Sequence, residues 1–310
     1  MLMAFKMPLL SPSALLSHAK DMQGLNFAYA GATATPANLL IPYPLPYQVE
    51  QFRKLKDQVL QTQREQSLAL KELDQDTYSD ALYTLCIGGN DIVGGISKGL
   101  QPQAIIQDIV PDVLNEIVSA IEALYSQGAR KFMAFNAPPL GCSTSVLHIL
   151  EDSGLPVDDL GCITAVNEID HVLNSELFRS VQRLRASLPN VTIIHFDYYA
   201  ANVEILSNPT KYGFNPDVVH NACCGVPGRK VTICAMENSH VCDNPDEYMV
   251  WDMIHWTEAF YRHIAKFVLN GDFSDPPTNL TKICDLSFED FGHTTYEAVY
   301  HRSLSLSFDK

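Results

Sequence analysis

The sequence predicts an α/β protein with a mainly parallel sheet covered by helices on both faces, a three-layer α/β/α sandwich. Short apolar runs at 81–87, 131–135 and 191–196 are typical of strands, and long stretches with helical spacing lie between them. Strands that alternate with long helices run parallel and need cover on both faces. Nothing marks a linker between two units, so residues 1–310 are expected to form a single domain.

The N-terminal part predicts a loop, a helix and the first strand. Residues 35–47 (TPANLLIPYPLPY) are rich in proline and predict a loop, and residues 48–73 predict a polar helix. The run ALYTLCI (81–87) ends in Gly88-Gly89 and predicts a buried strand.

The middle of the chain predicts a helix followed by a second strand. Between Ile105 and Leu124 apolar residues recur at helical spacing, and Pro111 marks either a kink or the first turn of a second helix. KFMAF (131–135) predicts a strand that closes with the loop NAPPLGC (136–142).

The second half repeats this order. A helix is predicted from Ile163 to about Leu188, where Pro189 stops it, and VTIIHF (191–196) predicts a third strand. Finally, Thr257 is expected to cap a helix that Asn270-Gly271 ends.

Composition excludes several classes of partner. The net charge of −15 argues against binding to nucleic acid or to an anionic membrane, and no apolar stretch is long enough for a membrane span. We expect a monomer, and the charge says nothing positive about its substrate.

Cysteine usage favours an oxidising compartment. Metal-site spacings of the CxxC kind are absent from the eight cysteines, so their two groups predict disulfides: Cys142 with Cys162, and Cys223, Cys224, Cys234 with Cys242. The sequons at Asn190 and Asn279 agree. The first twenty residues make a poor signal peptide, which leads us to expect that a segment before Met1 is missing.

Two glycine-containing segments could hold a ligand at the strand ends. IGGND (87–91) follows the first strand, and Asn90 could present its amide above the sheet; an oxyanion donor of this kind contributes about 3–4 kcal/mol. Taken alone, the segment is better explained as a simple strand-to-helix turn. NFAYAGATA (26–34) would let the backbone N–H of Gly31 approach a ligand, although close packing explains it as well.

The segment WDMIHW (251–256) contains a candidate general base. A single histidine before a helix is usually structural, but Asp252 lies three residues ahead of His255 and could orient its ring. No HExxH motif exists, so a zinc enzyme is not expected. The GISKG segment fits the G-x-S-x-G pattern, but Ser97 comes ten residues after the strand rather than on the turn that leaves it.

Seven segments together resemble plant GDSL esterase/lipases of the SGNH hydrolase superfamily. They occur in the order of that family: GLNFAYAGATA, IGGND, NAPPLGC, DLGC, NACCG, CDNPDEYMVWDMIH and the closing helix. The resemblance implies a flavodoxin-like sandwich and hydrolysis of carboxylic esters with no metal or organic cofactor. It implies that His255 is the general base, that Asp252 orients it, and that Gly31 and Asn90 donate to the oxyanion.

The resemblance also implies disulfides and a location. Cys142 and Cys162 are similar to one disulfide pair of the family, and the four cysteines from Cys223 to Cys242 to two more. Cys86 is then expected to be a free, buried packing thiol. A secreted or vacuolar protein is implied.

The family's Gly-Asp-Ser motif, which carries the nucleophilic serine, does not occur in these 310 residues. The sequence begins where the family's first helix is ending, so we expect the nucleophile block and the first strand to be missing. Ser11, Ser13 and Ser17 lack the context to replace the nucleophile. We therefore expect residues 1–310 to be inactive, or nearly so, as an esterase.

Two alternatives remain beside an ester hydrolase with an incomplete sequence. One is a non-catalytic protein that keeps its pocket for binding, and the other is an unproductive truncated product. Trp256 stands where many relatives have proline and would shape the acyl or alcohol pocket. The segments around Gly31 and Cys223 are most similar to the branch that hydrolyses small acyl esters of specialised metabolites, such as acetylated alkaloids and choline esters.

Overall fold

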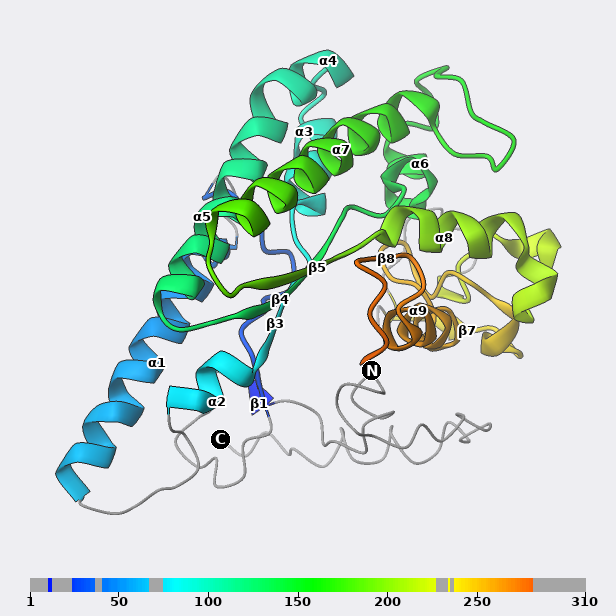
Figure 1. Ribbon diagram of the computed structural model, residues 1–310. Helices are drawn as coiled ribbons and strands as arrows, with labels where there is room; N and C mark the ends of the chain where they lie inside the picture. The colour runs from blue at the N-terminus through cyan, green and yellow to red at the C-terminus, as the bar shows by residue number, and fades with distance from the viewer. Residues whose placement is uncertain are drawn as a thin grey trace.

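A four-stranded sheet lies at the centre of the computed structural model, which describes residues 11–12, 24–36, 41–66, 75–226, 234 and 237–280 (Figure 1). Its strand order is β3-β4-β5-β8, with the first three strands parallel and β8 antiparallel to β5. The strands are β3 (Leu82–Leu85), β4 (Lys131–Phe135), β5 (Thr192–Phe196) and β8 (Ser274–Asp275). The predicted second and third strands are confirmed to within one residue.

Helices connect and cover these strands. The α-helices are α1 (Leu45–Gln66), α2 (Gln75–Asp80), α3 (Gly89–Ser97), α4 (Pro102–Ala104), α5 (Val110–Ser126), α6 (Thr144–Ile149), α7 (Thr164–Ser187), α8 (Tyr198–Ser207) and α9 (Glu258–Asn270). A π-helical turn, η3 (Ile105–Ile109), joins α4 to α5, and 3-10 turns occur at η4 (Leu140–Cys142), η5 (Pro209–Tyr212), η6 (Pro216–Val218) and η7 (Pro245–Glu247). Two small strand pairs complete the described elements: β1 (Ser11–Pro12) with β2 (Leu25–Asn26), and β6 (Cys224–Gly225) with β7 (His240–Val241).

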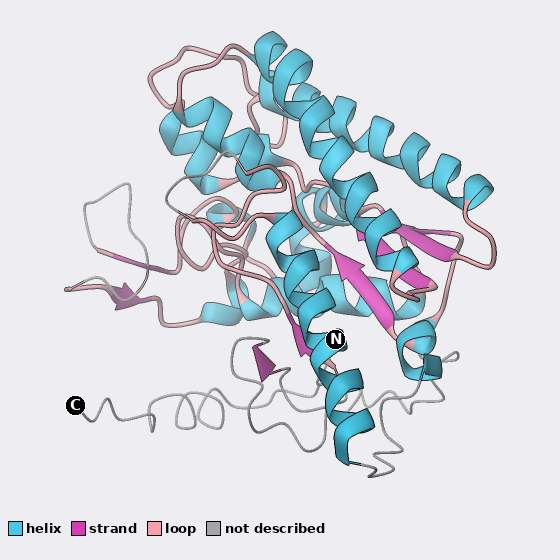
Figure 2. Ribbon diagram, turned by 90° about the vertical axis from the view of Figure 1, so that its left-hand side faces the viewer, coloured by secondary structure: helices cyan, strands magenta, loops and turns pink. Residues whose placement is uncertain are grey.

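Alternate residues of the strands face two separate hydrophobic clusters. Phe132 of β4 and Ile193 of β5 pack with α1, α3, α5 and α7, whereas their neighbours Met133 and Ile194 pack with α8 and α9. Because side chains alternate along a strand, these clusters lie on opposite faces of the sheet. Figure 2 shows the strands flanked by helices, and the three-layer α/β/α prediction is confirmed.

The predicted helix at 105–124 forms part of a longer helical run. The run extends through α4, the π-turn η3 and α5, and Pro111 stands in the first turn of α5. Pro111 has no N–H group, and it stands directly after the π-helical turn, in which the Val110 N–H bonds the Ile105 carbonyl. Helix α1 starts at Leu45, inside the predicted loop, with Pro46 in its first turn, where the N–H groups of a free helix start have no intrahelical partner. The predicted end of that helix, beyond residue 66, lies outside the described residues.

The strand at 82–85 is not buried, which corrects the prediction. Leu82 is 39% exposed and Thr84 is also exposed, whereas Leu85 is buried. In the described part of the chain β3 is the end strand of the sheet and pairs only with β4, so less packing covers it.

No helix within the described ranges has the length and apolar composition to cross a membrane.

The last helix begins and ends at the predicted caps. The Thr257 hydroxyl accepts a hydrogen bond from the Phe260 N–H at 3.2 Å and donates one to the Tyr248 carbonyl at 2.7 Å. Gly271 ends α9 with a left-handed φ of 84°. The same cap therefore starts the helix and joins it to the chain just before Asp252 and His255.

We expect Thr257→Ala to lower the free energy of unfolding by about 1–2 kcal/mol, because the helix loses its cap and the Tyr248 carbonyl loses its donor. Thr257→Ser keeps the hydroxyl and is the matched control. Urea unfolding measures both, and equal losses in the two variants would contradict the capping role.

Candidate active site

The Asp252–His255 pair is formed within one four-residue turn. Asp252 is 2% exposed, and its Oδ1 accepts hydrogen bonds from the N–H groups of Ile254 and His255, both at 2.8 Å. The Nδ1 of His255 lies 2.9 Å from the same Oδ1 and 3.0 Å from Oδ2. A carboxylate only accepts, so Nδ1 carries the proton and Nε2 is left as the basic nitrogen.

The charge of Asp252 is stabilised despite its burial. Burial alone would raise the pKa of Asp252, but the hydrogen bonds from the His255 ring and from the backbone N–H groups of Ile254 and His255 lower it further than burial raises it. Asp252 therefore remains ionised and can stabilise a positive charge on the neighbouring imidazole.

Asn90 and Asp91 stand in the first turn of α3 and hold the segment around residue 32. The Asn90 amide donates to the Ala32 carbonyl at 2.8 Å. Asp91, 6% exposed, accepts from the backbone N–H of Ala34 at 2.8 Å and from the N–H and hydroxyl of Thr35 at 3.0 and 2.7 Å. Two consecutive side chains thus fix a segment that is more than fifty residues away in sequence.

Gly31 precedes this held segment. Its φ of 74° is in the left-handed region that favours glycine, and a Cβ at this position would lie 3.3 Å from Ile41. Ala32 lines the cavity described below. Gly31 precedes Ala32 in the chain and is not one of the lining residues.

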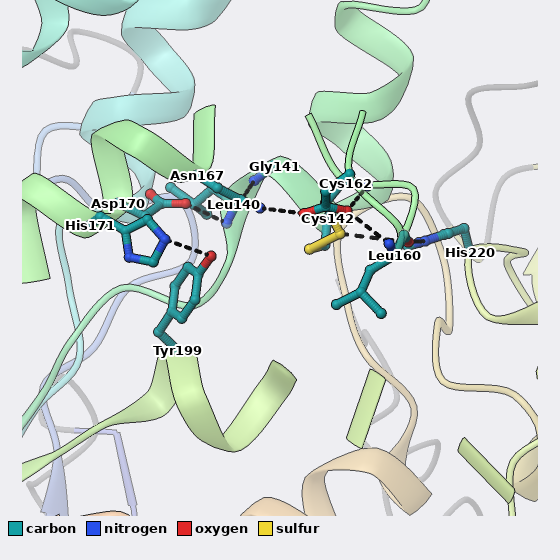
Figure 3. The surroundings of a disulfide bond; sticks show 11 residues. Leu140, Gly141, Cys142, Leu160, Cys162, Asn167, Asp170, His171, Tyr199 and His220 are labelled. Carbon is teal, nitrogen blue, oxygen red and sulfur yellow. Dashed lines mark hydrogen bonds between the residues drawn. A yellow bond between two sulfur atoms is a disulfide. The ribbon is translucent and has the colours of Figure 1, made fainter. Parts of the chain in front are cut away.

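Polar residues on one face of α7 hold the loop that follows β4. Figure 3 shows two of these contacts, from Asp170 to Leu140 and from Asn167 to Gly141. The bonds are Leu140 N–H to Asp170 Oδ2 (2.7 Å), Gly141 N–H to Asn167 Oδ1 (3.1 Å), Ala137 N–H to Asn174 Oδ1 (2.8 Å) and Asn174 Nδ2 to the Ala137 carbonyl (2.9 Å). A Cβ on Gly141 would lie 2.5 Å from Asn167 Oδ1, so only glycine allows this approach.

Asp170 is the buried carboxyl group of this α7 face. It is fully buried, and its Oδ1 has no hydrogen-bond partner among the described residues. Burial raises the pKa of Asp170 well above its ordinary value, although the N–H groups of Leu140 and Gly141 act in the opposite direction. We therefore expect the carboxyl group to keep its proton at pH values where exposed aspartates are ionised.

Three disulfides are present within the described ranges. Cys142 pairs with Cys162, which joins the end of the held loop to the start of α7 (Figure 3). The other two pairs are Cys223–Cys242 and Cys224–Cys234. All three bonds agree with the expected grouping, and they are compatible with a secreted protein.

A cavity of about 450 Å³ brings the predicted residues together. Asn90, Asp252 and His255 all line it, together with the loop after β4. Its aromatic lining consists of Tyr29, Tyr198, Trp256 and Tyr261. Within the described ranges no serine hydroxyl forms a hydrogen bond with His255; Ser143, which lines the cavity, caps α6 through the Val146 N–H instead.

Comparison with known proteins decides the family. A family model described as GDSL-like lipase/acylhydrolase matches residues 5–268. The chain belongs to the GDSL lipase/acylhydrolase family. It is 32% identical to the GDSL esterase/lipase LIP-4 of Arabidopsis thaliana, over 87% of this chain and 72% of that protein. It is also 34% identical to the GDSL esterase/lipase At1g09390 of the same plant (86% and 71%) and 30% identical to the GDSL esterase/lipase ENOD8 of Medicago truncatula (91% and 76%).

Sequence reasoning about this GDSL protein missed the residues that hold its loops. Asp91 stands directly after Asn90, but no local sequence pattern places its carboxylate against residues 34 and 35. The spacing of Asn167, Asp170 and Asn174 was the available signal, because i, i+3 and i+7 lie on one face of a helix. That face would ordinarily be apolar.

Cys86 is free, as expected, but it is not a packing thiol in a buried strand. It follows the last residue of β3, is exposed, and lines the cavity. The physical reason for the difference is that β3 is the end strand of the described sheet.

We expect Asp91→Asn to lower the free energy of unfolding by about 2 kcal/mol. One carboxylate oxygen becomes an amide donor that faces the N–H of Ala34 or Thr35, and two donors cannot satisfy each other. Chemical unfolding of this variant and of the exposed control Asp152→Asn tests this, and equal midpoints would contradict the role of Asp91.

We expect Asp170→Asn to change stability in a pH-dependent way. A folded-state pKa above the unfolded value of about 3.9 makes the wild type most stable below that value and progressively less stable as the pH rises toward the folded pKa. Asparagine does not titrate, so the variant should gain free energy of unfolding relative to wild type between about pH 4 and pH 8. Urea unfolding at both pH values measures the gain, and a difference that does not change with pH would contradict it.

Proposed function

We propose that this GDSL family protein is an ester hydrolase for small acyl esters, and that the described residues supply its general base, His255, and the orienting acid, Asp252. The observation that carries the proposal is the pair of contacts between His255 Nδ1 and the buried Asp252 carboxylate, beside a cavity that Asn90 also lines. This geometry sets the tautomer in which Nε2 can take a proton.

In the proposed reaction a serine hydroxyl attacks the ester carbonyl while His255 Nε2 accepts the serine proton. The negative Asp252 stabilises the imidazolium that forms, and the imidazolium then protonates the leaving alcohol. The Asn90 amide and the Gly31 N–H are assigned to the developing oxyanion. The Ala32 carbonyl accepts from the Asn90 amide and orients it, and that amide nitrogen carries two hydrogens.

The nucleophile is the part of this mechanism that residues 1–310 do not supply. No Gly-Asp-Ser occurs in the sequence, and in the described part of the chain no serine hydroxyl forms a hydrogen bond with His255. We infer that a polypeptide of these 310 residues turns esters over slowly or not at all, because loss of the nucleophile removes nearly all of the rate.

The cavity supports a small ester as the ligand. Its volume of about 450 Å³ is at the smaller end of the range for small-molecule sites. Trp256 stacks on Phe260 with ring centroids 4.4 Å apart, which fixes the indole as one wall beside His255. Small acyl esters of specialised metabolites, with apolar or aromatic parts, suit such a wall.

A second candidate function is ester binding without turnover. It is favoured by the intact cavity and the preformed His255–Asp252 pair in a chain without the family's nucleophile motif.

A single domain, a monomer and a secreted or vacuolar location remain predictions, and the three disulfides support the location.

The deciding experiment compares residues 1–310 with the protein purified from its natural source. We expect the recombinant chain to hydrolyse p-nitrophenyl acetate no faster than its His255→Ala variant does. If intact mass and N-terminal sequencing show a Gly-Asp-Ser segment in the natural protein, that protein should be active and His255→Ala should reduce its kcat by more than about 1000-fold. Turnover by residues 1–310 that disappears in His255→Ala would overturn the proposed lack of a nucleophile.

A further inference from the structure

The turn between α7 and β5 contains an asparagine that the proposed ester chemistry does not use. Its sequence, Asn190-Val191-Thr192, is an acceptor triplet for N-linked glycosylation. Two other asparagines, Asn208 and Asn279, also stand two residues before a threonine. Proline follows Asn208 and excludes it, because the central residue of an acceptor triplet cannot be proline. Asn190 and Asn279 remain, and their surroundings differ.

The two side chains that glycosylation needs at the α7–β5 turn stand at the protein surface. Asn190 is exposed, and within the described ranges its amide forms no hydrogen bond. Thr192, the first residue of β5, is also exposed. A sugar joined to the Asn190 amide would therefore extend into solvent and displace no contact of the described residues.

The backbone of this turn is held by its neighbours. The Tyr125 hydroxyl donates a hydrogen bond to the Pro189 carbonyl at 2.9 Å, on one side of Asn190. On the other side, the Thr192 N–H donates to the Arg130 carbonyl at 2.8 Å. The turn thus keeps its shape without help from the Asn190 side chain, which is free for modification.

The backbone conformation explains the asparagine but not the threonine. Asn190 has a φ of 57°, in the left-handed region that asparagine tolerates better than most residues. A turn of this kind would favour asparagine even in an unmodified protein. The Thr192 side chain forms no hydrogen bond among the described residues, and valine or isoleucine would suit the start of a strand equally well.

Asn279 lies in a less open place. It is only partly exposed and already has an interaction with other residues. The next residue, Leu280, is 4% exposed and packs in the hydrophobic cluster of α8 and α9. A glycan at Asn279 would have to leave the surface directly beside this buried side chain.

A glycan at Asn190 would stand at the edge of the sheet opposite the candidate active site. Strands β4 and β5 are parallel, and Asn190 comes just before β5 begins. The cavity beside His255 is lined by residues that follow the last residues of β3 and β4. In Figure 1 the turn that leaves α7 lies at the opposite end of β5 from α8. A bulky glycan there would leave the cavity open.

We propose that Asn190 carries an N-linked glycan and that Asn279 does not. In the transfer, Asn190 Nδ2 bonds to the anomeric carbon of an oligosaccharide and loses one proton. The bond from that carbon to a lipid diphosphate carrier breaks, and the lipid diphosphate leaves with the electron pair. The proposal rests on the predicted secreted or vacuolar location and is independent of ester hydrolysis.

The test uses the protein purified from its natural source. Trypsin cuts after Arg185 and Lys211 and releases Asn190 and Asn208 on one peptide, so Asn208 is an internal control. Peptide N-glycosidase A leaves aspartate wherever a glycosylated asparagine stood. We expect mass spectrometry to find aspartate at position 190 after treatment and asparagine at positions 208 and 279. An untreated digest controls for spontaneous deamidation.

Thiol titration of the same unfolded sample separates two ways in which the proposal could fail. Disulfide-bonded cysteines together with an unmodified Asn190 would overturn the proposed glycan alone. Reduced cysteines together with an unmodified Asn190 would overturn the predicted location as well, because disulfides persist in the compartments where glycans are added.

Variants of residues 1–310, secreted from plant cells behind an added signal peptide, locate the glycan. We expect Thr192→Ala to abolish the mass that the glycosidase removes, although the asparagine is unchanged. Thr192→Ser keeps the hydroxyl and should keep the glycan, and Thr281→Ala should have no effect. A glycan that survives Thr192→Ala, or a glycan at Asn279, would overturn the proposal.

Discussion

The buried carboxylate of Asp91 is the contact on which the candidate site depends. It accepts three hydrogen bonds from Ala34 and Thr35, and the adjacent Asn90 holds Ala32. The N-terminus of one helix thereby fixes the segment that carries Gly31. In the same way, the polar face of α7 holds residues 137–141, the loop that follows β4. Rigid helices therefore set loop positions that the loops alone could not keep.

Much of the fold could be predicted because its signals are local. Strand β4, helix α7 and helix α9 follow directly from apolar periodicity and from the Thr257 and Gly271 caps. The exposure of β3 could not be predicted in this way, since burial of a strand depends on its neighbours in space. The predicted start of α1 was wrong by three residues, because proline in the first turn of a helix has the same local signature as proline in a loop.

The candidate site likewise contains some residues that could be predicted from local sequence and others that could not. Asn90, Asp252 and His255 stand in recognisable segments, and the structure brings them to one cavity. Asp91 and Asp170 could not be recognised, because a carboxylate is ordinarily a surface group and its burial is defined by distant N–H donors. The pairing of Cys223 and Cys224 likewise needed the three-dimensional course of the chain, since both partner choices fit the sequence.

The hydrogen bonds that orient His255 all lie between residues 252 and 255. The base and its orienting acid therefore form one local hydrogen-bonded turn whose geometry needs no partner from across the cavity. This turn keeps its shape whether the opposite wall presents a reactive group, an inert side chain or solvent. An intact aspartate–histidine turn in a protein of this family thus reports on the local chain alone, and the chemistry is decided by what faces it.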